Sequence, residues 1–202
     1  MYIVGLTGGI GAGKSTISVL FSQKDLPIYN SDLSAKMLME QVGQLKKDII
    51  KSFGGQANSS GQLDTKYLSQ RVFKDASALR RLNALVHPWV LSDFKSWMCH
   101  HQAPYCIKET AILFESGTHL MCDLIITITA PLGERIRRIM QRDQVSQAQV
   151  LERVKNQWTD QEKHSRSDII IENIGDIKVL EETIERVHKQ ILRMLRRKAL
   201  LL

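Results

Sequence analysis

One glycine-rich stretch near the start of the chain has the residue types and spacing needed to hold a phosphate group. Residues 8–16 read Gly-Gly-Ile-Gly-Ala-Gly-Lys-Ser-Thr, which matches the pattern G-x-x-x-x-G-K-[ST]. Glycines let the backbone adopt positive φ angles and approach a bulky anion, and consecutive N–H groups then form a concave anion site. Lys14 would supply a point charge for the outer phosphates, and Ser15 an oxygen ligand for Mg²⁺.

The segments on either side of this stretch fit the same interpretation. Residues 2–6 form a short apolar run that favours a buried strand, and residues 17–21 begin an amphipathic helical pattern. A helix N-terminus adds partial positive charge at the mouth of the loop. The alternative is an ordinary glycine-rich turn, but the full spacing between a strand and a helix favours a phosphate site.

Asp32 is the second candidate, because it stands at the carboxyl end of the expected second strand, residues 26–32. Open parallel sheets bind ligands at the carboxyl ends of their strands. A carboxylate there could accept a proton from a hydroxyl group that attacks the γ-phosphate of a nucleotide. Asp32 also precedes a helical pattern, so a simple N-cap explains it equally well.

Three arginines lie at helical spacing in the second half of the chain. Pro131 opens a helix that is expected to reach Arg142, and Arg135, Arg138 and Arg142 share one of its faces. Planar guanidinium groups suit phosphate oxygens, so this face could belong to a lid that closes over the nucleotide. A solvated basic helix is the alternative, and Arg137, on another face, serves as the internal control.

Two weaker signals remain open between a functional and a structural role. Asn173 and Gly175 follow the expected fifth strand, beside the position of a nucleotide base, although a plain strand-to-helix turn needs the same residues. His87 and Pro88 end one helical run and could be only a helix break.

A missing motif argues against one class of nucleotide-binding protein, and the acidic residues leave the metal ligands open. The guanine signature N-K-x-D is absent, which weakens the case for a GTPase. Glu109 and Glu115 lie near the expected third strand, but neither ends an apolar strand in the way that a Walker B aspartate does.

The elements alternate between strand and helix, which predicts an α/β fold with a five-stranded, mainly parallel sheet and helices on both faces. Strands are expected at residues 2–6, 26–32, 105–109, 123–129 and 167–172. Residues 33–102 are mostly helical, with one turn-rich patch at residues 54–61, and are longer than a simple crossover requires. Further helices are expected at residues 131–142, at 147–158 and from residue 177 onward.

Composition is typical of a globular protein of about one domain. The 202 residues are 43% hydrophobic and 24% charged, and no apolar run approaches the length of a membrane span. We expect a cytoplasmic protein, with Cys99, Cys106 and Cys122 as small buried thiols. The formal charge of +7 suits a protein with phosphorylated ligands as well as one that binds nucleic acid. The basic cluster near residues 193–198 reads as the solvated face of a helix.

Several segments in order resemble the dephospho-CoA kinase family, which catalyses the last step of coenzyme A biosynthesis. Residues 6–16 (LTGGIGAGKST) are similar to that family's form of the P-loop. The resemblance continues through Asp32 and through residues 71–73 (RVF), 82–88 (LNALVHP), 112–115 (ILFE), 141–143 (QRD) and 168–175 (DIIIENIG).

This resemblance implies a three-layer P-loop kinase fold and the transfer of the ATP γ-phosphate to the ribose 3′-hydroxyl of dephospho-CoA, with Mg²⁺. It implies a nucleotide-binding core (residues 1–31, 104–130 and 166–202), a helical CoA-binding insertion (32–103) and a lid (131–165). The partners implied are ATP and dephospho-CoA, with neither nucleic acid nor membrane and with no expectation for the oligomeric state.

The site residues carried over by position divide by role. The proposed catalytic residues are Asp32 as the base, Lys14, and Arg142 as the lid arginine. Asp32 and His87 would face the acceptor, and Ser15 would hold the metal. The residues that would bind ATP are Gly11, Ala12, Gly13, Lys14, Ser15, Thr16, Arg138, Asn173 and Gly175.

The chain departs from the family pattern at two positions. The family usually has an acid two residues before the base, where this chain has Asn30, and commonly a proline where this chain has Ala111. Asp32 would therefore act without an acidic neighbour to raise its pKa. The alternatives that remain are another small-molecule or nucleotide kinase with the same core, and a nucleic-acid-dependent P-loop ATPase.

Overall fold

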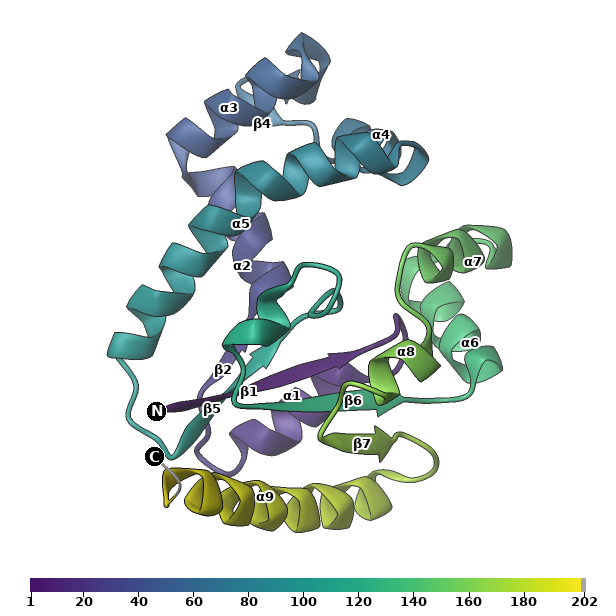
Figure 1. Ribbon diagram of the computed structural model, residues 1–202. Helices are drawn as coiled ribbons and strands as arrows, with labels where there is room; N and C mark the ends of the chain where they lie inside the picture. Colours follow the sequence, from purple (N-terminus) through teal and green to yellow (C-terminus); the bar gives the residue numbers. More distant parts are fainter. Residues whose placement is uncertain (201–202) are drawn as a thin grey trace. The chain divides into compact units, whose positions relative to one another are not determined.

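The computed structural model describes residues 1–200, apart from the side chains of residues 73 and 74. The chain divides into two compact units, one made of residues 1–30 and 102–202 and the other of residues 31–101 (Figure 1). Each unit is described below by itself.

The first unit is built on a five-stranded sheet in which every neighbouring pair of strands is parallel. The strands are β1 (Tyr2–Gly8), β2 (Ile28–Asn30), β5 (Tyr105–Glu109), β6 (Leu124–Thr129) and β7 (Ile169–Glu172). Their order across the sheet is β2-β5-β1-β6-β7, so β1 lies at the centre. The predicted five-stranded parallel sheet is confirmed.

The strands β1 and β6 are largely apolar because both of their faces are covered. Val4, Leu6, Ile126 and Ile128 are fully buried in one large core, which also contains residues of the helices α1 and α9. Ile125, the neighbour of Ile126 in β6, faces the opposite side and packs in a second cluster with Leu113, Phe114 and Trp158.

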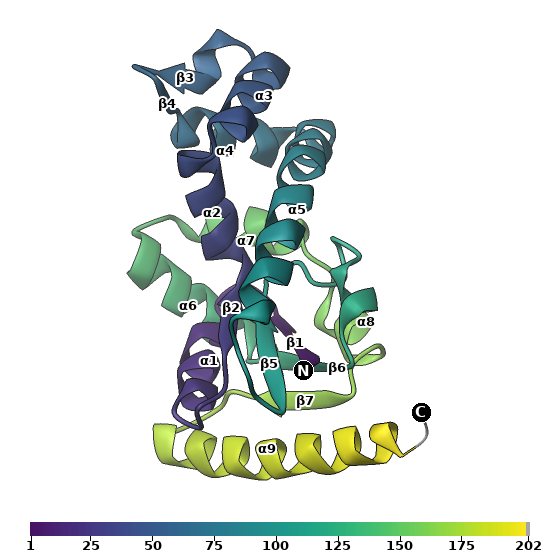
Figure 2. The same ribbon diagram turned by 90° about the vertical axis from the view of Figure 1, so that its left-hand side faces the viewer.

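Within its described residues, this unit has five α-helices and a 3₁₀ turn at Thr118–Met121. The α-helices are α1 (Lys14–Ser22), α6 (Leu132–Asp143), α7 (Gln147–Lys155), α8 (Asp160–His164) and α9 (Ile177–Ala199). The long helix α9 runs beside the sheet, along β7 (Figure 2), and its stripe Leu180, Ile184, Val187, Ile191 and Leu195 is buried. The basic cluster near its end therefore lies off the buried stripe, as predicted; of its members, Lys198 forms an ion pair with Asp123.

The second unit is mostly helical. Its elements are α2 (Ser31–Gln41), α3 (Gly43–Phe53), α4 (Thr65–Lys74), α5 (Ala76–Cys99) and the short hairpin β3 (Asn58–Ser59) with β4 (Gln62–Leu63). A 3₁₀ turn at Gly55–Ala57 and this hairpin occupy the patch predicted to be turn-rich. The hydroxyl of Ser34 donates to Asp93 at 2.7 Å and ties α2 to α5.

Two alternatives that the sequence left open, and one prediction, about individual residues are wrong. Asp32 is not the N-cap of a helix, because α2 begins one residue earlier and Asp32 lies in its first turn. Helix α5 continues through Pro88 instead of ending at His87. Cys99 is exposed, at the end of that helix, and only Cys106 is fully buried as expected, with Cys122 half-buried.

The remaining differences are at element ends. The helix expected to reach residue 158 ends at Lys155, and the short helix α8 begins after it, capped at its N-terminus by Thr159. Among residues 1–200, no helix combines the length and the hydropathy needed to cross a membrane.

Candidate phosphate-binding site

The glycine-rich loop connects the carboxyl end of the central strand to the first turn of α1. Gly11 and Gly13 have φ angles of 80° and 96°, in the left-handed region that favours glycine. Space is limiting as well: a Cβ atom on Gly11 would lie 2.7 Å from the carbonyl oxygen of Arg135, and one on Gly13 would lie 2.0 Å from Nδ2 of Asn173. The loop is therefore in contact with neighbouring elements and needs glycine for two separate reasons.

The predicted cradle residues Gly11, Ala12, Gly13, Lys14, Ser15 and Thr16 form this loop and the first turn of α1. The first N–H groups of a helix have no partner within the helix, and a helix N-terminus is therefore suited to an anion. Lys14 reaches back over the loop, where its Nζ donates to the carbonyl oxygen of Gly8 at 3.0 Å. The ammonium group thus lies on the loop that it is predicted to serve.

Glu109 is the acidic residue next to the predicted metal ligand Ser15. Its side chain is buried at the end of β5; Oε1 lies 3.5 Å from the hydroxyl of Ser15, and Oε2 accepts a hydrogen bond from Ser18 at 2.7 Å. Glu115 is used elsewhere: it accepts the N–H of Trp158 at 2.8 Å and lies 3.4 Å from Nζ of the buried Lys163. Of the two glutamates that the sequence left open, Glu109 is the one beside the P-loop.

The three arginines of α6 have different surroundings. Arg135 is 6% exposed and forms an ion pair with Asp160 at 3.1 Å. Nη1 of Arg135 would lie 1.8 Å from a Cβ atom on Gly9, so its guanidinium packs against the P-loop. Arg138 is half-buried, and its Nη1 would lie 3.9 Å from a Cβ atom on Gly13.

Arg142 is the most exposed of the three, and it binds a carboxylate of its own helix. Its Nε and Nη2 donate to the two oxygens of Asp143 at 2.7 and 3.2 Å, and Arg153 also donates to Asp143 at 2.6 Å. These hydrogen bonds, that of Arg142 above all, lower the pKa of the Asp143 carboxyl. Arg137, the control residue, pairs with Glu134 at 2.7 Å and is exposed.

Two of the three arginines that were expected to face a phosphate are therefore paired with carboxylates of the protein. Arg135 has Asp160 and Arg142 has Asp143. Within the described part of the chain, no carboxylate lies within 4.0 Å of the guanidinium of Arg138, which is the arginine nearest to Gly13.

Asn173 also lies against the loop, on the side of β7. Its side-chain Nδ2 donates to the carbonyl oxygen of Ala12 at 2.8 Å, and its backbone N–H donates to Thr129 at the end of β6. Gly175 follows with a φ angle of 98° and open space where a Cβ atom would be. The sequence signal at residues 173–175 thus marks a contact with the P-loop that spacing alone could not reveal.

The two predicted residues on the acceptor side belong to the second unit. Asp32 is exposed, in the first turn of α2, and stands two residues beyond the end of β2 in the chain. His87 is half-buried in the middle of α5. Asn30, the last residue of β2, is in register with Glu109 of β5, so β2 ends level with the acid beside the P-loop.

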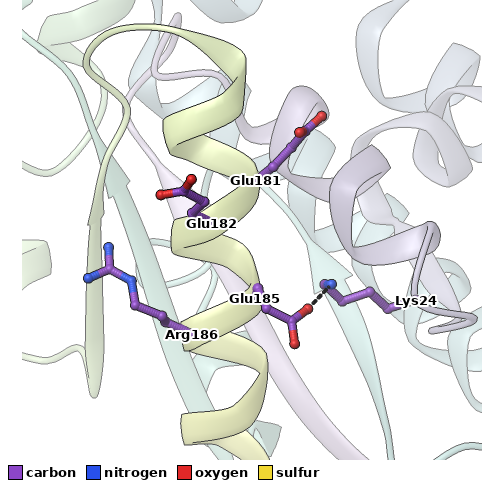
Figure 3. Close-up of a pocket in the computed structure, with 5 residues that line it drawn as sticks. All are labelled: Lys24, Glu181, Glu182, Glu185 and Arg186. Atoms are coloured by element: carbon purple, nitrogen blue, oxygen red, sulfur yellow. Dashed lines mark hydrogen bonds and ion pairs between the residues drawn. The ribbon is translucent and has the colours of Figure 1, made fainter.

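A separate hollow lies on the surface beside α9 and contains none of the predicted site residues. It is lined by Lys24, Glu181, Glu182, Glu185 and Arg186, with an ion pair between Lys24 and Glu185 (Figure 3). Hydrogen bonds from Lys24 and Lys189 lower the pKa of Glu185 to about 2. The charge of Glu185 in this hollow is thus balanced by Lys24 and Lys189.

A family model described as dephospho-CoA kinase matches residues 2–179. The chain belongs to the dephospho-CoA kinase family. All predicted site residues, from Gly11 to Gly175, lie within the part of the chain that matches this family.

Individual members agree with this assignment along almost the whole chain. A dephospho-CoA kinase from Fusobacterium nucleatum is 31% identical over 185 residues, which cover 91% of this chain and 95% of that protein. A crystal structure of a protein from Thermus thermophilus has 33% identity and a TM-score of 0.82, covering 95% of this chain and 96% of that one. The structure of a dephospho-CoA kinase from Campylobacter jejuni has 26% identity and a TM-score of 0.65, covering 95% and 97%.

Proposed function

We propose that this protein transfers the γ-phosphate of ATP to the ribose 3′-hydroxyl of dephospho-CoA and so forms coenzyme A and ADP. The observation that carries this proposal is the match of the dephospho-CoA kinase family over residues 2–179. We propose the cytoplasm as its location.

The nucleotide end of the reaction is supported by the P-loop and by Arg138. The first-turn N–H groups of α1 and the ammonium of Lys14 would hold the β- and γ-phosphates. Arg138, which forms no ion pair within 4.0 Å among the residues described, would add a guanidinium at the same loop. Asn173 and Gly175, beside this loop and after β7, are the proposed contacts on the adenine side.

The residues beside the P-loop also fit a magnesium ion. Oxygen atoms are the ligands that Mg²⁺ prefers. The hydroxyl oxygen of Ser15 and the carboxylate Oε1 of the buried Glu109 lie 3.5 Å from each other. Ser15 would bind the ion, and Glu109 would hold it directly or through a water molecule. When bound, the ion neutralises charge on the phosphates of ATP.

The acceptor end rests on Asp32 and on the helical unit. We propose that the carboxylate of Asp32 orients the ribose hydroxyl group and accepts its proton as the oxygen attacks the γ-phosphorus. His87 and the unit formed by residues 31–101 would bind the CoA moiety. The bond from phosphorus to the bridging oxygen of ADP breaks as the new bond forms, and ADP leaves.

Residues 131–165 would act as the lid, with Arg142 as its phosphate contact. Arg142 is mostly exposed and pairs with Asp143 in a contact that costs little to exchange, because exposed ion pairs contribute at most about 1 kcal/mol. Closure over ATP would allow Arg142 to replace this carboxylate with phosphate oxygens and would exclude water from the reaction.

An assay of ADP release with a panel of acceptors tests this function directly. Dephospho-CoA, several nucleoside monophosphates and shikimate are each supplied with ATP and Mg²⁺, and phosphorylation of dephospho-CoA alone is the expected result. Turnover of another acceptor in preference to it would assign a different small-molecule kinase. ATP hydrolysis that needs DNA or RNA would assign the alternative class that the net charge of +7 raised.

A further inference from the structure

Three side chains from separate elements hold the P-loop in the first unit. Arg135 comes from α6, Gln157 from the turn that follows α7, and Asn173 from the turn after β7. Arg135 and Asn173 lie on features that the sequence already marked. Gln157 lies on no such feature. Its hydrogen bond to the P-loop joins residues 147 positions apart in the chain, compared with 161 for that of Asn173.

Gln157 accepts a hydrogen bond from the backbone of the loop itself. Its side-chain Oε1 lies 2.8 Å from the backbone nitrogen of Ile10, across a separation of 147 residues. Ile10 lies between the end of β1 and the left-handed Gly11, in a segment that is itself neither strand nor helix. A side chain that accepts this N–H therefore fixes the direction of the loop just before the cradle begins.

The next residues of the same segment strengthen this contact. Asp160, three residues after Gln157, pairs with the guanidinium of Arg135 that packs on Gly9, and also lies 3.4 Å from the hydroxyl of Thr129 at the end of β6. Residues 157–160 thus contact the loop once directly and once through Arg135, and are anchored to the sheet beside it.

The bonds divide the N–H groups of the loop into two sets. Ile10 donates to Gln157, and Ala12 donates to the carbonyl oxygen of Gly9 at 3.0 Å. The N–H groups at the start of α1 have no acceptor within the helix and are the groups that would meet the phosphates. A loop that binds an anion with its backbone binds more tightly if these N–H groups already point toward the anion site before the ligand arrives. Ordering the loop during binding costs free energy and lowers the affinity.

We propose that Gln157 is a positioning residue, which holds Ile10 so that the P-loop is formed for ATP before ATP binds. The proposal rests on the proposed function only in taking ATP as the ligand of the loop. A neutral amide is suited to this task, since a carboxylate at the same place would put a negative charge beside the phosphates of the nucleotide.

The test compares Gln157→Met with the matched control Gln161→Met. Methionine is close to glutamine in length but has no strong acceptor, and Gln161 is exposed on α8, four residues along the chain. We expect faster hydrogen exchange of the Ile10 amide without ligand, and an ATP dissociation constant raised roughly tenfold, which corresponds to about 1.4 kcal/mol. The KM for dephospho-CoA and the unfolding temperature should stay at the control's values.

Both binding and exchange are measured without an acceptor, so failure of the proposed reaction would leave this test intact. Unchanged exchange at Ile10 together with unchanged ATP affinity would overturn the proposal. A lower unfolding temperature, together with equal losses of affinity for ATP and for dephospho-CoA, would overturn it too. Gln157 would then only stabilise the fold. Gln157→Glu adds a check: it keeps the acceptor, so Ile10 should stay protected while ATP binding weakens, most strongly at low salt.

Discussion

At the residue scale, the chemistry proposed for this protein depends on a single exposed carboxylate. Asp32 has no acidic neighbour two residues earlier, where the chain has Asn30. We expect Asp32→Asn to lower kcat by on the order of 10²- to 10⁴-fold, the range for loss of a general base, with ATP affinity unchanged. Steady-state kinetics and calorimetric titration with ATP measure the two effects separately.

The control for this variant is Glu40→Gln, which removes the charge of another exposed acid on the same helix. It should retain turnover within about twofold, as expected of a surface position away from the chemistry. Near-normal turnover of Asp32→Asn would show that another group takes the proton.

Arg142 and Arg137 offer a matched pair on one helix. Both are exposed and each is paired with a carboxylate of α6, Asp143 and Glu134 respectively. If Arg142 exchanges its carboxylate for phosphate in the transition state, Arg142→Met should lower kcat roughly a hundredfold, as removal of one oxyanion donor does. Arg137→Met should change it less than twofold. Equal effects of the two substitutions on kcat would contradict a phosphate contact by Arg142.

At the scale of elements, the P-loop is held by close contact with α6 as well as by its own conformation. Gly11 has a φ angle of 80°, and a Cβ atom there would lie 2.7 Å from a backbone oxygen of that helix. We expect Gly11→Ala to lower the unfolding temperature and to raise the KM for ATP, since left-handed backbone alone costs alanine about 1–2 kcal/mol.

Gly133→Ala is the matched control for this substitution. Gly133 lies within α6 and has open space around it, with no positive φ angle. Alanine should stabilise the helix by about 0.5–1 kcal/mol and leave the KM for ATP unchanged. Thermal unfolding checks that the unfolding temperature falls in Gly11→Ala and rises in Gly133→Ala. A fall in both variants would contradict the open space found around Gly133.

Most elements could be predicted because their signals are local. The run from residue 124 to 129 is apolar and β-branched, and the stripe of α9 repeats at helical spacing, so both were placed within a residue or two. The failures had non-local causes. Pro88 favoured a break, but the helix continues because residues on both sides of it, such as Val86 and Val90, are buried. Helix α8 is five residues long and too short to show a periodicity.

The site was predictable in its types of residue but not in its contacts. Lys14, Ser15 and Asp32 follow from motif and position, whereas Glu109 and Gln157 are linked to the loop by bonds that span 94 and 147 residues. A single sequence carries no signal for a pairing over such a distance, because only the order of the strands brings the two segments together.

At the scale of the whole molecule, burial sets how the three thiols respond to pH. Desolvation raises the pKa of Cys106 to about 11 and that of Cys122 to about 12, while Cys99 is exposed. A pKa of about 11 leaves roughly one thiolate per thousand thiols at pH 8. A thiol reagent should therefore modify one cysteine rapidly in the folded protein at pH 8, and all three after denaturation.

The same shifts give the direction of an effect on stability. Because folding raises these two pKa values above that of a free thiol, near 8.5, the folded state holds protons that the unfolded state has released. The free energy of unfolding should fall as the pH rises from about 8.5 toward 11. Mass spectrometry after labelling identifies the modified thiol, and rapid labelling of Cys122 at pH 8 would contradict its burial.

The order of the strands has a consequence for how this enzyme family could diversify. Strands β2 and β5 are parallel neighbours, and such a pair must be joined by a crossover. Here the crossover is the whole unit of residues 31–101, which folds around contacts of its own. Such a module could be exchanged for another while strand β1, which leads into the P-loop, stayed paired on both sides. If the helical unit binds the acceptor as proposed, a change of acceptor would then need no change in the sheet.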